Sequence, residues 1–134
     1  MKRKLKFIIF SIALIVCICG ILIFKLGKSS LPIIYPIEDI EIKSVEDGEY
    51  IGYVNNSLIK VKLAVSVLNG EIREIEILQH DNGLGKKAES IIADIIKNQS
   101  LKVDAVSSAT YSSNSILKAI ENALINSSRE VEKK

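Results

Sequence analysis

Tryptophan is absent from the 134-residue sequence, and cysteine, proline and histidine are scarce, with two, two and one residues. Both cysteines, Cys17 and Cys19, lie in an apolar N-terminal stretch. The rest of the chain therefore cannot hold a disulfide scaffold or a cysteine-based metal or redox site. With His80 as the only histidine and no HExxH, Walker or GxSxG pattern, the common hydrolase and metalloenzyme centres are missing as well. We predict no catalytic residue and no metal ligand.

The basic residues are unevenly distributed. The formal charge is +2, but residues 1–28 contain six of the 18 basic residues and no acidic one. The remainder carries 12 basic and 16 acidic side chains, a net charge of −4. This negative balance argues against a nucleic-acid binder. The length of the remainder suits one small domain but not two.

Residues 7–24 form an uninterrupted run of 18 uncharged, mostly apolar residues. As a helix the run would span about 27 Å, close to the thickness of the hydrocarbon core of a bilayer. A cleaved signal peptide is the alternative, but its apolar part covers only about 7 to 15 residues and ends in small side chains, unlike Ile21–Phe24. We predict an uncleaved single-pass anchor over residues 1–28. The basic residues before the run place the N-terminus in the cytoplasm and the rest outside the cell membrane.

Three segments follow the predicted anchor. Residues 29–46 contain both prolines and read as a partly packed connector. Residues 47–128 read as the folded domain, and residues 129–134 as a solvated, charged tail.

The domain begins with strand patterns. Residues 49–54 and 58–68 read as strands, the second with alternating apolar residues that require a buried face. Asn69-Gly70 predicts a two-residue hairpin turn into a third strand over residues 71–79. With that turn Ile72 faces Val67, but the later isoleucines fall on the opposite side. Either a β-bulge near Arg73-Glu74 restores the pattern, or the sheet buries both faces there.

Two helical patterns complete the domain. Apolar residues recur at helical spacing from Ala88 to Ile96 and again from Ile116 to Leu124. The predicted fold class is therefore α+β, a small antiparallel sheet with two packed helices, preceded by one N-terminal transmembrane helix.

The segment before the second helix is rich in hydroxyl groups. Six Ser and Thr residues, besides Tyr111, lie between Ser107 and Ser115. Hydroxyls and backbone N–H groups at a helix N-terminus can bind an anion such as a phosphate, and Tyr111 offers an aromatic face. The simpler interpretation is that Ser112 or Ser113 is an N-cap, although a cap needs only one hydroxyl.

This segment resembles a known motif. Asp104 to Thr110, with the pattern Asp-x-x-Ser-x-Ala-Thr, is similar to the flavinylation motif of the FMN-binding domain family, which includes flavin subunits of sodium-translocating NADH:quinone oxidoreductase and of the Rnf complex. Asp47–Gly52 resembles the opening strand of the family, and Asn69–Ile77 with His80 resembles its hairpin and following turn. Ser112–Ile116 and the helix after them extend the similarity to Leu124.

The resemblance implies a cofactor and an attachment site. In this family a flavin transferase uses FAD to attach FMN through its phosphate to the motif threonine, here Thr110. The resemblance implies further FMN contacts from the loop and helix start and from the turn after the third strand: Asp104, Ser107, Ser108, Ala109, Tyr111 and Ser112, together with His80, Gly83 and Gly85. For His80 the alternative is an exposed residue in a glycine-rich turn. The family usually has Gly at the position of Ser108, where a positive φ would strain Ser by about 1 kcal/mol or more.

The expected function is that of a membrane-anchored, extracytoplasmic flavoprotein. It would carry FMN at Thr110 and relay electrons between a membrane donor and an acceptor, as a carrier more than as a stand-alone enzyme. Two alternatives remain at this point, a protein that binds FMN noncovalently and a flavin-free adaptor or assembly protein of a membrane redox complex.

Overall fold

A computed structural model describes residues 1–26, 31–81 and 85–131. The chain divides into two compact units, Met1–Ser30 and Leu31–Lys134, and each is described by itself.

The first unit is helix α1 (Lys2–Leu26), a single helix of 25 residues. The candidate membrane span within it, Arg3–Phe24, is 22 residues long, or about 33 Å of helix. Its large apolar side chains, such as Phe7 and Phe24, are exposed. Length and composition allow this helix to cross a membrane, and a signal sequence near an N-terminus has the same properties.

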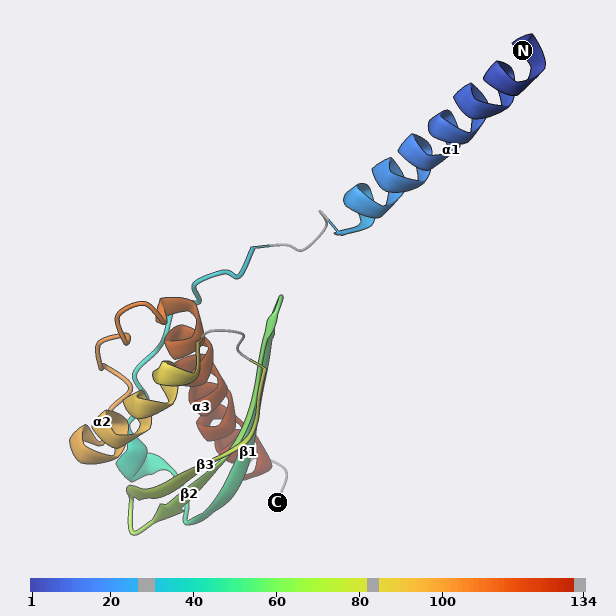
Figure 1. The fold of residues 1–134 in the computed structure, drawn as a ribbon. Helices are drawn as coiled ribbons and strands as arrows, with labels where there is room; N and C mark the ends of the chain where they lie inside the picture. Colours follow the sequence, from blue (N-terminus) through green and yellow to red (C-terminus); the bar gives the residue numbers. More distant parts are fainter. Residues whose placement is uncertain (27–30, 82–84, 132–134) are drawn as a thin grey trace. The chain divides into compact units, whose positions relative to one another are not determined.

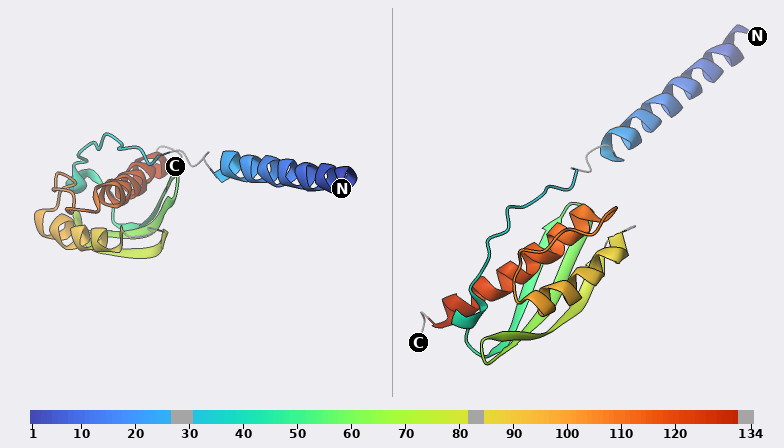
Figure 2. Two further views of the ribbon diagram at one scale, coloured as in Figure 1. Left: turned by 45° about the horizontal axis from the view of Figure 1, so that its top comes forward. Right: turned by 90° about the vertical axis from the view of Figure 1, so that its left-hand side faces the viewer.

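The second unit is an α+β domain, as predicted. Strands β1 (Gly48–Asn56), β2 (Ile59–Leu68) and β3 (Glu71–Asp81) form an antiparallel sheet in the order β1-β2-β3. Helices α2 (Ile91–Asn98) and α3 (Thr110–Val131) both pack on one face of this sheet (Figure 1, Figure 2). The alternating side chains of β2 form the centre of the core: Ile59, Val61, Leu63, Val65 and Val67 are all buried.

The register of β3 contains a β-bulge, which is one of the two arrangements that the sequence leaves open. Val67 pairs with Ile72, but Ser66 pairs with Glu74, so Arg73 is the extra residue. The shift returns Ile75 to the buried face, opposite Val65. A second, unpredicted bulge between Lys62 and Leu63 brings His80 opposite Val61. Asn69 and Gly70 have φ angles of 55° and 70°, as a type I′ turn requires.

The two predicted apolar stripes are buried at their centres. A 3-10 helix, η2 (Gly85–Ser90), precedes α2, and Ala88, Ile91 and Ile95 are buried against the sheet. In α3 the buried stripe is Ile116, Leu117, Ile120, Ala123 and Leu124. Helix α3 ends at Val131, so the first three residues of the segment expected to be a tail are helical.

A segment without regular structure runs along α3 before the sheet begins (Figure 2). We call residues 31–40 the strap. The strap is followed by a short 3-10 helix, η1 (Ile42–Ser44), and Tyr35, Ile37 and Ile40 pack against the core. Most of the segment expected to be a connector therefore belongs to the second compact unit.

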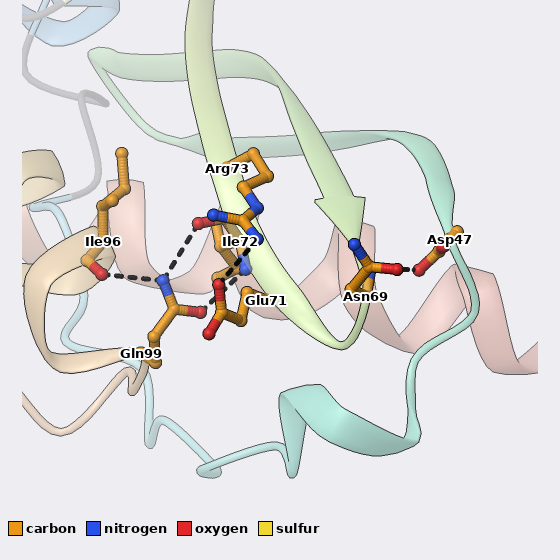
Figure 3. A network of polar contacts seen from close by, with 7 residues as sticks. All are labelled: Asp47, Asn69, Glu71, Ile72, Arg73, Ile96 and Gln99. Carbon is orange, nitrogen blue, oxygen red and sulfur yellow. Dashed lines mark hydrogen bonds and ion pairs between the residues drawn. The ribbon is translucent and has the colours of Figure 1, made fainter.

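Gln99 stabilises the hairpin end of this unit through its side-chain amide (Figure 3). Its Oε1 accepts from the Ile72 N–H at 2.7 Å, and its Nε2 donates to the Ile72 carbonyl at 2.9 Å and the Ile96 carbonyl at 2.7 Å. The amide thus pairs with the backbone of the edge strand β3 as another strand would. This contact hinders the pairing of that edge with another chain.

Candidate flavin-attachment site

The hydroxyl-rich segment forms a closed loop that leads into α3. The Ala109 N–H donates to the Val106 carbonyl at 3.0 Å, and the Ser113 N–H donates to the Ala109 carbonyl at 2.9 Å. The Ser113 hydroxyl accepts a hydrogen bond from the Val106 N–H at 3.0 Å. Three backbone-directed bonds therefore fix the loop against the first turn of the helix.

The N-cap prediction is wrong. Helix α3 begins at Thr110, so Ser112 and Ser113 lie inside its first turn and neither is the N-cap. The prediction assigned a capping role to a serine whose hydroxyl instead binds the loop seven residues upstream. The apolar stripe that located this helix starts only at Ile116, and it carries no information about the polar first turn.

Ser108 has a φ angle of 65°, in the left-handed region that glycine adopts without penalty. The positive φ considered for this position from the sequence is therefore present in the structure. In Ser the Cβ atom approaches the following carbonyl oxygen, which costs roughly 1–2 kcal/mol. The loop before Thr110 is consequently strained at one residue.

The predicted loop residues differ in accessibility. Asp104, Ser107, Ser108 and Thr110 are exposed, and Tyr111 is 46% exposed. The side chains of Ala109 and Ser112, by contrast, are buried, with 6% and 3% exposed. Thr110 is thus on the surface of the domain, and Tyr111 beside it presents an accessible ring.

The start of α3 is suited to an anionic group. The helix has 22 residues, and its first turn contains no acidic side chain. The first N–H groups of a helix have no acceptors within the helix, and the helix dipole adds a partial positive charge there. Exposed hydroxyls beside such N–H groups fit the phosphate of a nucleotide.

His80 and Gly85 lie near the same end of the unit. The end of β3, η2 and the start of α3 gather there in both orientations (Figure 1, Figure 2). The His80 side chain is 2% exposed, and its Nδ1 lies 2.9 Å from Oε1 of Glu89 in η2. The His80 side chain is therefore buried and joins β3 to η2, contrary to the alternative of an exposed histidine. Gly85 is buried at the first position of η2, and Gly83 lies outside the described residues.

Sequence reasoning missed a row of buried polar residues around the strap. Asn56 and Asn114 form hydrogen bonds with the strap backbone, and Asn56 also donates to the Ser115 Oγ. Glu121 accepts a hydrogen bond from the Glu38 N–H at 3.4 Å. These four side chains are between 0% and 8% exposed. Asn114 and Glu121 are seven residues apart and so lie on one face of α3, a helical spacing that can be found in the sequence.

Among the residues that the structure describes, no cluster of three His, Cys, Asp or Glu side chains could hold a metal ion.

The fold is a small α+β domain in which an exposed, hydroxyl-rich loop leads into the start of a long helix. The family model of the FMN-binding domain matches residues 56–125, just over half of the chain. The chain belongs to this family, and FMN is its cofactor. No curated protein and no solved structure matched the chain.

Proposed function

We propose that this FMN-binding protein carries FMN covalently, through a phosphoester to Thr110, and serves as a membrane-anchored, extracytoplasmic electron carrier. The observation that supports this most directly is the combination found at Thr110. Thr110 is exposed and is the first residue of the long helix α3, and the loop before Thr110 has the motif of the family.

Thr110 is the acceptor in a transfer that we assign to a separate flavin transferase with FAD as donor. The Thr110 Oγ forms a bond to the phosphorus of the FMN half of FAD, and the pyrophosphate P–O bond breaks. AMP leaves with the electron pair of that bond, and the hydroxyl proton goes to a base of the transferase or to water. The flavin is neither oxidised nor reduced in this step.

The neighbouring residues have separate roles in the proposal. The Ser107 hydroxyl and the N–H groups of the first turn, including that of Ser112, bind the phosphate oxygens. Asp104 is recognised by the transferase or fixes the loop, because an anion would repel the phosphate. Tyr111 provides a face for the flavin ring, and Ser108 and Ala109 shape the backbone beside it. His80, at the end of β3, and Gly85, at the start of η2, approach the ring.

The bound flavin would supply the redox chemistry, and the protein would set its position and its potential. Helix α1 would anchor the chain in the cell membrane with the N-terminus in the cytoplasm. A donor and an acceptor in or at the membrane would then exchange electrons with the flavin.

The test is to express the full chain with a flavin transferase and to measure the intact mass of the denatured protein. We expect a gain of one FMN minus water and a fluorescent band in a denaturing gel. Thr110→Ala should abolish both signals, and Thr110→Ser, which keeps a hydroxyl, should retain them. A wild-type chain of unmodified mass beside an active transferase would contradict covalent attachment. Flavin released on denaturation would then indicate noncovalent binding, and a colourless native protein a flavin-free role.

A further inference from the structure

The strap is held to the domain by side chains rather than by a neighbouring strand. The Asn56 Oδ1 accepts from the Ile33 N–H at 2.9 Å, and its Nδ2 donates to the Ile33 carbonyl at 2.7 Å. The Asn114 Oδ1 accepts from the Tyr35 N–H at 2.7 Å, and its Nδ2 donates to the Tyr35 carbonyl at 2.9 Å. Each amide satisfies both backbone groups of one strap residue, as a strand would.

Both amides connect the strap to the first turns of α3. Asn114 is itself the fifth residue of that helix. Asn56 also donates from Nδ2 to the Ser115 Oγ at 3.1 Å, and Ser115 donates to the Tyr111 carbonyl at 2.8 Å. A continuous series of hydrogen bonds therefore runs from the strap to the residue that follows Thr110.

Burial makes this arrangement costly to disrupt. Asn56, Asn114 and Ser115 are 3%, 8% and 0% exposed. When a buried backbone or amide group loses its hydrogen-bond partner, the fold is destabilised by the full desolvation penalty of that group. The strap and the start of α3 should therefore stay in one arrangement as long as these three side chains are intact.

We propose that Asn56, Asn114 and Ser115 are positioning residues of the flavin-attachment site, which use the strap to hold the first turn of α3 in the geometry that Thr110 needs for phosphoester formation. This inference rests on the function proposed above. Through these three side chains the strap is accordingly part of the site.

The chain provides a matched control at the opposite end of the domain. Gln99 binds both backbone groups of Ile72 in the same manner as Asn114 binds Tyr35, but at the hairpin (Figure 3). Asn114→Ala and Gln99→Ala each remove one amide that pairs with a backbone. Both should destabilise the fold, whereas only Asn114→Ala should disturb the attachment site. Ser115→Ala keeps the size of the residue and favours the helix, so it should fold even if Asn114→Ala does not.

Two readouts test the proposal, in the full chain and at a temperature where all variants are folded. The first is amide hydrogen exchange of the flavin-free protein at Val106 and Ser113, whose N–H groups bond within the site. We expect Asn114→Ala to accelerate this exchange about tenfold and Ser115→Ala about threefold, relative to wild type. Gln99→Ala should accelerate exchange at Ile72 and leave Val106 and Ser113 within about twofold of wild type.

The second readout is the rate of FMN attachment by the transferase. Asn114→Ala should lower kcat about tenfold while KM for the protein stays within about twofold, because a displaced acceptor impairs the reacting geometry more than recognition. Equal rates for Asn114→Ala and Gln99→Ala would overturn the proposal, as would unchanged exchange at Val106 and Ser113. If wild type itself were never modified, the proposed function would fail, and the exchange data would still decide whether the strap orders this turn.

Discussion

Ser108 combines a polar side chain with a left-handed backbone at φ 65°. Replacement by Gly removes a strain of roughly 1–2 kcal/mol. The greater flexibility of Gly in the unfolded chain lowers the stability of the fold by about 0.5–1 kcal/mol. We expect Ser108→Gly to stabilise the domain by about 0.5–1 kcal/mol in urea denaturation. Ser107→Gly is the control. Because Ser107 is not among the residues with positive φ, its replacement by Gly should lower the stability of the domain. A destabilised Ser108→Gly protein would contradict the assignment of strain to this residue.

Asp39 ties the strap to the loop that follows α2. Burial raises the pKa of its carboxyl group, but hydrogen bonds from the Leu101 N–H and the Ser100 hydroxyl, together with the charge of Lys102, lower the pKa more, to below its ordinary value of 3.8. A depressed pKa stabilises the fold above the unfolded-state value, and this contribution disappears as the pH falls through the folded-state pKa.

Asp39→Asn should therefore be less stable than the wild type at neutral pH, by an amount that shrinks as the solution is acidified below the ordinary carboxyl pKa. Urea denaturation at a series of pH values from about 7 to 3 measures this difference. A stability gap that stays constant across the range would show that the charge of Asp39 contributes nothing.

At the scale of elements, the contact of β1 with α3 depends on Gly52. A Cβ atom at this position would lie 1.8 Å from the Ala119 carbonyl oxygen and 3.1 Å from the Ala123 Cβ. Since the obstacle is helix backbone, Gly52→Ala would push α3 away from the sheet and should destabilise the fold by about 3 kcal/mol. In the same strand a Cβ atom at Gly48 would lie no closer than 3.1 Å to the Tyr50 side chain, so Gly48→Ala should cost much less. Thermal unfolding of the two variants gives the comparison, and equal losses would contradict this packing.

The sequence predicted elements well where burial sets the pattern. Alternation along β2 and the Asn69-Gly70 turn determined the hairpin, and the misplaced isoleucines of β3 pointed to the bulge at Arg73. The start of α3 could not be placed in the same way, because Thr110–Ser115 are polar residues whose role depends on contacts far away in the sequence. Asn114, for example, binds Tyr35, 79 residues upstream.

At the scale of the whole molecule, the folded unit begins with the strap. Ile42 and Val45, like Tyr35, Ile37 and Ile40, pack against the core, and they all precede the domain start predicted at residue 47. Proline content and weak patterning predicted a connector there, because sequence periodicity cannot detect a segment whose backbone is held by distant side chains.

A chain that starts at Leu31 should fold, whereas one that starts at Asp47 should lose at least about 3 kcal/mol through the missing apolar contacts and the unpaired amides of Asn56 and Asn114. Circular dichroism during heating measures the difference. Equal midpoints for the two chains would show that the strap is dispensable.

Unlike the strap, the candidate site could be proposed from the sequence, because a motif of neighbouring residues carries it. The resemblance located Thr110, and the structure shows that Thr110 is exposed at the start of α3. The central point of the proposal is that Thr110, rather than another hydroxyl residue of the segment, carries the flavin.

That point can be measured directly on the flavin-carrying protein. Trypsin cleaves after Lys102 and Lys118, so one peptide, Val103–Lys118, contains every hydroxyl residue of the segment. Fragmentation of this peptide by mass spectrometry assigns the added mass to a single residue. We expect fragments that place FMN minus water on Thr110, whereas fragments that place it on Ser107, Ser108 or another residue of the peptide would contradict attachment at Thr110.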